Sequence, residues 1–365
     1  MAHQRATGLD DMTNALDRIG FLIHNPEMFN HYHEVWQHLP AGSVEIAVTG
    51  KEQKDIDAIV AICIKRQLPW RDARELLARN ERYTTLVSSF PIHYLRGADS
   101  PYLIKSLGHY NLRFMYANGK AGWNFQKWNQ AYDAILCFGP YQAEQLDFCR
   151  ETLKIQMGYP RFDRFFNQPL DRAKRLKELK LDPERKTVVW LPTWSNLSSI
   201  DLFTPAIAKL QDRYNVIVKP HPLTITDEPA RMRQLERFDC VFREHIDNVE
   251  LFQLADFLLC DYGGSAFGGI YTNCNVLLLD LPNAAADPLT GDDSSDIWLR
   301  KVMPHVSAQQ TSRLAAILED EALWSAQQSV RANLSQYYFA PFYGYAGQVA
   351  ALAIANASKT LTRRR

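Results

Sequence analysis

Short apolar, β-branched segments alternate along the chain with longer segments of helical periodicity. In the first half, these short segments cover Ile19–Ile23, Val44–Val48, Thr84–Val87, Arg113–Tyr116, Ala134–Cys137 and Lys154–Met157. In the second half, they cover Val188–Leu191, Asn215–Val218, Cys240–Phe242, Phe257–Cys260 and Val276–Leu279. Strands that alternate with helices form parallel sheets covered by helices on both faces. The pattern therefore predicts an α/β protein with two doubly wound sheets.

A charged, helix-prone segment separates the two sets of predicted strands. It runs from Asp171 to Lys180, and the strand pattern restarts at Thr187. This spacing predicts a Rossmann-like domain at 1–170, a second at 171–340, and a C-terminal helix with a basic tail at 341–365. A chain of 365 residues is also longer than one hydrophobic core usually supports. Two such sheets form a cleft between the carboxyl ends of their strands, where ligands bind.

The overall charge gives no long-range attraction to nucleic acid or to an anionic bilayer, so any attraction to phosphate must be local. Lysine plus arginine and aspartate plus glutamate number 41 each, so we expect no nucleic-acid partner. No apolar stretch is long enough to span a bilayer, and Met1 to Asp10 lack the apolar core of a signal peptide. We therefore expect a cytoplasmic protein. The apolar Val349–Ala357 segment and the arginines after it leave peripheral contact with the inner membrane face open, although a docked helix is favoured.

Three motifs follow predicted strands of the second half. Lys219–Pro222 (K-P-H-P) holds a lysine and a histidine that can bind a phosphate oxygen, with a turn histidine satisfied by backbone groups as an equal alternative. Asp261–Ser265 (D-Y-G-G-S) leads into a helix start suited to a pyrophosphate, although glycines there can serve packing alone. Leu191–Trp194 (L-P-T-W) adds a hydroxyl and an indole, for which a core role is favoured. We expect His221 and Asp261 on adjacent strand ends.

Taken together, these motifs resemble those of the CDP-glycerol glycerophosphotransferase family, whose members build teichoic-acid-like and capsular polymers. The family's A-P-T-W, K-x-H-P and A-D-x-L-I-T-D-Y-S-S match residues 191–194, 219–222 and 254–265, and its G-x-P-R-x-D matches 158–163. The resemblance covers roughly residues 110–280. It implies a GT-B fold and transfer of glycerol phosphate from CDP-glycerol to a polymer hydroxyl, with release of CMP. It implies no cofactor, and no metal pair is apparent because His31 and His33 do not share a helical face.

The resemblance also assigns roles to single residues. His221 contacts the phosphates at the reacting centre, and Ser265 holds the pyrophosphate with the backbone of Gly263 and Gly264. The further expected substrate contacts are Arg161, Thr193, Trp194, Lys219 and Asp261. From their position alone, Asp247 and Glu250 are expected to meet the ribose or cytosine, with a helix cap as an equal alternative for Asp247.

The sequence departs from the family pattern at two places. Gly263 and Gly264 replace two serines, so phosphate-binding hydroxyls are missing. Asn118 stands where the family's W-H-G has its general base, and asparagine cannot accept a proton at neutral pH. His109 and His24 are the histidines expected nearest the cleft-facing loops, whereas His31 is expected to have a surface or packing role. A nucleotide-sugar glycosyltransferase of the same fold and an inactive polymer-binding relative remain alternatives.

Overall fold

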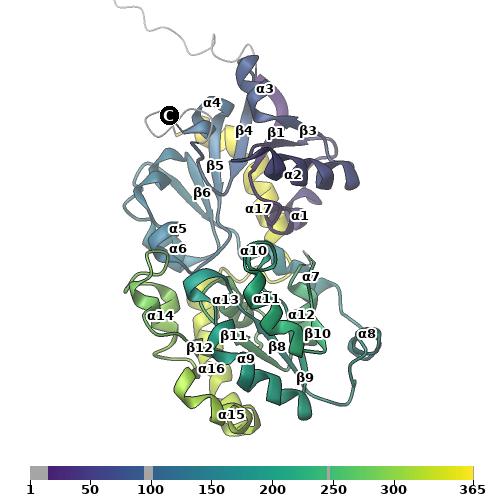
Figure 1. Cartoon of the computed structure of the whole chain (residues 1–365). Helices are drawn as coiled ribbons and strands as arrows, with labels where there is room; N and C mark the ends of the chain where they lie inside the picture. The colour runs from purple at the N-terminus through teal and green to yellow at the C-terminus, as the bar shows by residue number, and fades with distance from the viewer. Residues whose placement is uncertain (1–14, 94–101, 245–246, 365) are drawn as a thin grey trace, which may run out of the picture.

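The computed structural model describes residues 15–93, 102–244 and 247–364, and two parallel sheets dominate it (Figure 1). The first sheet has the strand order β3-β2-β1-β4-β5-β6-β7. Its strands are β1 (Ala15–Ile23), β2 (Val44–Val48), β3 (Trp70–Asp72), β4 (Arg82–Ser88), β5 (Gly108–Phe114), β6 (Ala134–Cys137) and β7 (Leu153–Gln156). The second sheet has the order β10-β9-β8-β11-β12-β13. Its strands are β8 (Thr187–Leu191), β9 (Asn215–Val218), β10 (Cys240–Val241), β11 (Phe257–Cys260), β12 (Asn275–Asp280) and β13 (His305–Ser307).

Helices connect and cover the strands of both sheets. Up to the predicted domain boundary they are α1 (Met28–Trp36), α2 (Gln53–Lys65), α3 (Ala73–Ala78), α4 (Leu103–Leu107), α5 (Ala121–Asn124), α6 (Pro140–Gln145) and α7 (Asp163–Asn167), with the 3₁₀ turns η2 (Lys127–Ala131) and η3 (Pro160–Phe162). After it come α8 (Arg172–Glu178), α9 (Ile200–Ala208), α10 (Pro222–Asp227), α11 (Pro229–Gln234), α12 (Val249–Leu254), α13 (Gly264–Tyr271), α14 (Ser295–Leu299), α15 (Leu314–Glu319), α16 (Glu321–Tyr338), α17 (Ala346–Ala355) and α18 (Ala357–Thr362).

The two predicted doubly wound sheets are confirmed, with differences at the sheet edges and in the bounds of one strand. The edge strands β3 and β13 were not predicted, since each is only three residues long. β5 begins at Gly108, five residues before the predicted start at Arg113, because the apolar residues Met115 and Tyr116 belong to the loop after the strand. The division at residue 170 remains a prediction, although α8 packs against α12, beside the second sheet.

The C-terminal helices return to the first sheet, so the favoured docked helix is confirmed. α17 packs against α1 and η3, and α18 packs against β4 and β5. Gly347 permits close contact, because a Cβ atom there would lie 2.7 Å from the carbonyl oxygen of Glu34. Within the described ranges, no helix combines the length and apolarity needed to cross a membrane.

The chain crosses between the two sheets twice, and the crossings are tied together. The carboxylate of Asp163, at the first crossing, accepts hydrogen bonds from the backbone N–H groups of Ala346 (3.1 Å) and Gly347 (2.6 Å) at the second. The Asn167 side chain donates to the carbonyl of Gly344 at 2.7 Å. Burial raises the pKa of Asp163 to about 7. One side of the molecule therefore holds both connections in a single cluster.

Candidate active site

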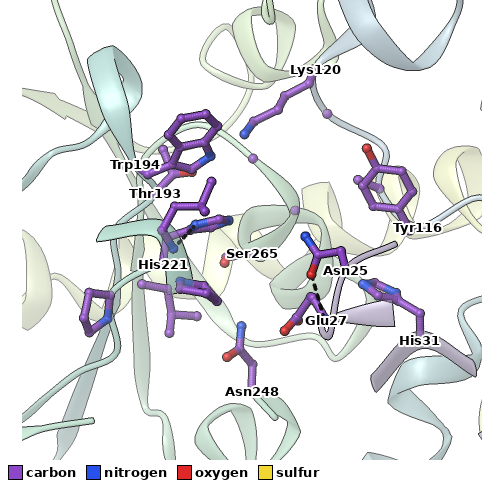
Figure 2. A pocket seen from close by; sticks show the side chains of 18 of the residues that line it. Asn25, Glu27, His31, Tyr116, Lys120, Thr193, Trp194, His221, Asn248 and Ser265 are labelled. Atoms are coloured by element: carbon purple, nitrogen blue, oxygen red, sulfur yellow. Dashed lines mark hydrogen bonds between the residues drawn. The ribbon is translucent and has the colours of Figure 1, made fainter. Parts of the chain in front are cut away.

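A cavity of about 1070 Å³ lies between the carboxyl ends of the two sheets. Loops after β1 and β5 and the start of α2 form its first-domain wall, and loops after β8, β9 and β11 form the other. Nine of the residues expected at the site line it: Arg161, Thr193, Trp194, Lys219, His221, Asp261, Gly263, Gly264 and Ser265. Figure 2 shows His221 and Ser265 on one side and Asn25, Glu27 and His31 on the other. The three motifs of the second half therefore meet at one edge of the sheet.

His221 and Asp261 do not occupy adjacent strand ends, because β8 lies between β9 and β11. The carboxylate of Asp261 instead accepts hydrogen bonds from the N–H group of Thr193 (2.9 Å) and from the N–H (2.8 Å) and hydroxyl (2.9 Å) groups of Ser199. Burial raises the pKa of Asp261 to about 6, and these hydrogen bonds oppose that rise. The Asp261 side chain therefore shapes the loop after β8.

His221 is held by the backbone and also faces the cavity. It precedes α10 as the N-cap residue, and its Nδ1 accepts a hydrogen bond from the N–H group of Leu223 at 3.2 Å. In the neutral ring the proton is therefore on Nε2. The ring centroid lies 6.0 Å from that of Trp194, which lines the cavity beside it. Both interpretations of this histidine are thus compatible, because the backbone contact uses Nδ1 and the residue also lines the cavity.

The glycine turn after β11 presents the N-terminus of α13 to the cavity. Gly263 has φ of +141°, a conformation that favours glycine, and its N–H group donates to Asp296 Oδ1 at 2.9 Å. The N–H group of Gly263 is thus already bound, contrary to its expected pyrophosphate role. A Cβ atom at Gly264 would meet no atom within 4 Å, so the turn is open there. The helix dipole and the Ser265 hydroxyl remain suited to an anion.

Asp296 also links the two domains. Its Oδ2 accepts a hydrogen bond from the N–H group of Lys120 at 2.7 Å, while its Oδ1 binds Gly263. Lys120 has a left-handed φ of 57°, and its Nζ lies 5.7 Å from the ring centroid of Trp194. This contact brings a first-domain lysine over the glycine turn of the second domain, as Figure 2 shows.

Two lysines in the cavity have no carboxylate partner. Lys219, at the end of β9, is only 5% exposed, and Lys120 is partly buried. Among the described residues, neither Nζ lies within 4.0 Å of a carboxylate. Burial is the main cause that lowers the pKa of both ammonium groups. Carboxylates act on both groups from a longer distance, chiefly Asp296 on Lys120 and Glu27 on Lys219, but none of these is in direct contact, so each lysine favours an anion in the cavity.

Arg161, in contrast, is fully paired. Its guanidinium contacts Glu27 Oε1 at 2.9 Å, Asp247 Oδ1 at 3.0 Å and His31 Nε2 at 3.3 Å. Asp247 also pairs with Arg164. Arg161 therefore joins loops of the two domains at the cavity floor, and Asp247 belongs to this network instead of facing a ligand.

Four expected site residues do not line the cavity. Glu250 pairs with Arg175 of α8 at 2.5 Å, and Asp247 binds the two arginines. Asn118 is 0% exposed, and its carbonyl accepts a hydrogen bond from the Ser295 hydroxyl at 2.9 Å. His109 is the second residue of β5, at the amino end of the strand, whereas the cavity lies at the carboxyl end. His109 therefore lies away from the cavity because β5 begins earlier in the chain than predicted.

The first-domain wall contains residues that the motifs did not identify. Glu27, Lys120 and Tyr116 line the cavity, and so does His31, for which a surface or packing role was expected. His31 is buried, and burial followed by the charge of Arg161 lowers its pKa well below the usual value. His24, the first residue after β1, also lines the cavity, and burial lowers its pKa to about 4. His24 was expected near the cleft because it follows the first strand, and the same position after a strand end could have found Glu27 and Tyr116.

Comparisons with known proteins agree with this geometry. A family model described as CDP-Glycerol:Poly(glycerophosphate) glycerophosphotransferase matches residues 30–273, whereas a comparison with curated proteins gives no match. A variant of the wall teichoic acid polymerase TagF is similar in structure, with a TM-score of 0.67 at 15% identity over 97% of this chain and 91% of that one.

Two UDP-bound structures are similar as well. S. aureus MnaA has a TM-score of 0.59 at 12% identity over 95% and 98% of the two chains. Anabaena Alr3699/HepE with UDP and glucose has 0.56 at 10% over 95% and 100%. At these identities the structures establish the GT-B fold, and the family model, which covers most of the chain, establishes the family. The chain belongs to the CDP-glycerol:poly(glycerophosphate) glycerophosphotransferases.

Proposed function

We propose that this protein transfers glycerol phosphate, or a related polyol phosphate, from a CDP-activated donor to a hydroxyl group of a cell-surface polysaccharide or polymer, with release of CMP. The observation that carries the proposal is the pair of lysines without carboxylate partners, Lys120 and Lys219, in a cavity that includes the start of α13. The negative charge of a nucleotide diphosphate suits a cavity whose lining includes two lysines without direct contact to any described carboxylate. We place the reaction in the cytoplasm, with peripheral contact at the inner membrane face through the acceptor.

The mechanism we propose is an in-line displacement. The acceptor oxygen forms a bond to the β-phosphorus of the donor, and the bond from that phosphorus to the bridging oxygen breaks, which leaves both electrons on CMP. His221 Nε2, Lys219, Lys120 and the N-terminus of α13 stabilise the charge that accumulates there. The Trp194 ring lies near both Lys120 and His221 and forms part of the wall beside these groups.

The proton of the acceptor hydroxyl requires a base, and we propose His24. Both carboxylate oxygens of Glu27 are bound, one by Arg161 and one by Asn30 (3.2 Å), and Arg161 beside His31 disfavours a second positive charge. His24 Nδ1 is buried and, in the described part of the chain, has no hydrogen-bond partner. The low pKa of His24 keeps the ring neutral, and the negative donor raises that pKa as it binds. The imidazole takes the proton and later releases it to solvent.

The alternatives receive less support. A nucleotide-sugar glycosyltransferase would use a similar anion site, and two similar structures contain UDP. The family match, however, concerns a CDP-glycerol donor. The inactive relative was suggested by Asn118, and the presence of His24 in the same cavity weakens that argument.

The test is donor binding and turnover, measured on the wild type and on His221→Ala. Thermal stabilisation by CDP-glycerol, CDP-ribitol, CMP, UDP and GDP reports binding, and release of CMP from CDP-glycerol reports turnover. We expect stabilisation by cytidine nucleotides only, and loss of turnover in the variant. Stabilisation by UDP or GDP instead would refute the proposal in favour of a glycosyltransferase. Stabilisation by no nucleotide, without turnover, would favour a binding protein.

A further inference from the structure

The first-domain wall of the cavity presents an exposed indole ring. Trp123 of α5 lines the cavity and is 37% exposed, although large aromatic side chains are usually more deeply buried. Its ring is fixed from behind, because the Phe90 centroid lies 4.8 Å away at an interplanar angle of 33° and the Trp128 centroid lies 6.1 Å away. The wall thus offers a rigid aromatic surface to a ligand.

The charges of the cavity leave no cation for a polyanionic acceptor. Its cationic side chains are Lys54, Lys120, Arg161 and Lys219, and its acidic ones are Glu27, Glu52, Asp55, Asp227 and Asp261. Lys54 pairs with Glu52 at 3.0 Å, and Arg161 is paired as described above. The two remaining lysines are assigned to the donor diphosphate. Each described cationic side chain of the cavity is therefore either paired with a carboxylate or assigned to the donor, and Lys54 is the most exposed of them.

The acidic residues strengthen this conclusion at one end of the cavity. Glu52 and Asp55, at the start of α2, and Asp227, at the end of α10, line it together, with Lys54 as the cation among them. The charge of Asp227 also acts on Lys54, so the two sides of the cavity face each other here. A chain of phosphodiesters that entered here would meet an excess of negative charge.

We infer that the first-domain wall is the acceptor subsite and that the acceptor is an uncharged saccharide whose ring packs against Trp123. This inference rests on the proposed function for the assignment of the two lysines to the donor. Aromatic rings offer a large apolar face, and sugar rings present C–H groups that pack on such a face while their hydroxyls bind polar neighbours. His24, whose ring centroid lies 6.2 Å from that of Phe90, borders the same wall and is near enough to meet an acceptor hydroxyl. The acceptor thus differs in charge from a growing poly(glycerophosphate) chain.

The experiment compares two kinds of acceptor probe on the full chain. One set contains uncharged oligosaccharides (maltotriose, cellotriose and chitotriose), and the other is a synthetic glycerol phosphate trimer. Saturation-transfer NMR measures binding, and CMP release from CDP-glycerol measures transfer. We expect at least one oligosaccharide to bind and to accelerate CMP release. We expect Trp123→Ala to lower kcat/KM for that acceptor by about tenfold and to leave the KM for CDP-glycerol unchanged.

Trp70→Ala is the matched control, since Trp70 is 39% exposed on the edge strand β3 and does not line the cavity. Trp123→Phe retains a ring and should keep most of the saccharide affinity. The inference is overturned if the glycerol phosphate trimer is the better acceptor, or if no oligosaccharide shows binding that depends on Trp123. Failure of the proposed function is seen separately, as the absence of CDP-glycerol binding in the thermal-shift measurement.

Discussion

Lys219→Met tests the electrostatic basis of the donor site. The substitution keeps the length and apolar stem of the side chain and removes only the ammonium group. Lys219 is 5% exposed, so its charge is poorly screened by water. Two unit charges about 4 Å apart attract by about 4 kcal/mol at an effective dielectric constant of about 20. After the phosphate's loss of hydration is subtracted, we expect about 2–3 kcal/mol, which is roughly a 30- to 150-fold weaker affinity for CDP-glycerol.

The same substitution should stabilise the free protein. Because the ammonium group of Lys219 is buried and no described carboxylate lies within 4.0 Å, Glu27 and Asp247 offset its loss of hydration only in part, and its removal relieves that cost. A gain on the order of 1 kcal/mol would raise the melting temperature by about 1–2 °C. Burial lowers the pKa of Lys219, so the penalty is complete at neutral pH and disappears as pH rises through that lowered pKa towards 10.5. The advantage of the methionine variant should therefore shrink at alkaline pH.

Isothermal titration with CDP-glycerol and thermal unfolding of the free protein measure the two effects. Lys209→Met serves as the control, because Lys209 is an exposed lysine of the second domain outside the cavity. Wild-type affinity in Lys219→Met would refute the role of the unpaired lysines. A loss of affinity accompanied by a loss of stability would point to a folding defect and would also contradict the reasoning.

Three further predictions follow from the site and its surroundings. His24→Asn should lower kcat by about 100-fold without weakening CDP-glycerol binding, and wild-type kcat/KM should fall only below about pH 5, because the base must be neutral and its pKa is about 4; unchanged kcat would exclude His24 as the base. The stability of the wild type should fall as pH rises from about 4 to about 7, because burial raises the folded-state pKa of Asp163 to about 7, and Asp163→Asn should remove this pH dependence. Urea midpoints that change equally in wild type and variant between about pH 5 and about pH 8 would contradict this. Glu250→Gln should change turnover by less than about twofold, because Glu250 pairs with Arg175 outside the cavity; a large loss of CMP release would show that it does contact substrate.

Most of the donor side could be predicted from the sequence, because its motifs are contiguous. Each of the segments 191–194, 219–222 and 261–265 follows a strand that its apolar residues identify, and parallel strands bring such ends to one edge. The order β9-β8-β11 was beyond reach, because apolar periodicity does not determine which strands pair. The hydrogen bond from the Thr193 N–H group to the Asp261 carboxylate depends on that order, because it joins the ends of β8 and β11.

The acidic residues show a second limit of sequence reasoning. Asp247 and Glu250 were expected at the ligand because they begin a helix close in sequence to the glycine turn. Their arginine partners Arg161, Arg164 and Arg175 lie more than 70 residues earlier in the chain, and only the packing of α7 and α8 against α12 brings them together. Lys120 was missed for the same reason, since its contact with Asp296 of the second domain holds it beside the glycine turn.

The paired chain crossings have a mechanical consequence. Hydrogen bonds at the two ends of α7, to Asp163 and from Asn167, join this helix to the segment that enters α17. The two connections between the domains therefore behave as one hinge. Relative motion of the domains is then a rotation about that cluster, and its amplitude grows with distance from it. The hydrogen bonds of Asp296 to Lys120 and Gly263 join the two domains across the cleft. If they break when the domains open, Lys120 moves away from the glycine turn, and the binding of the proposed nucleotide product becomes weaker.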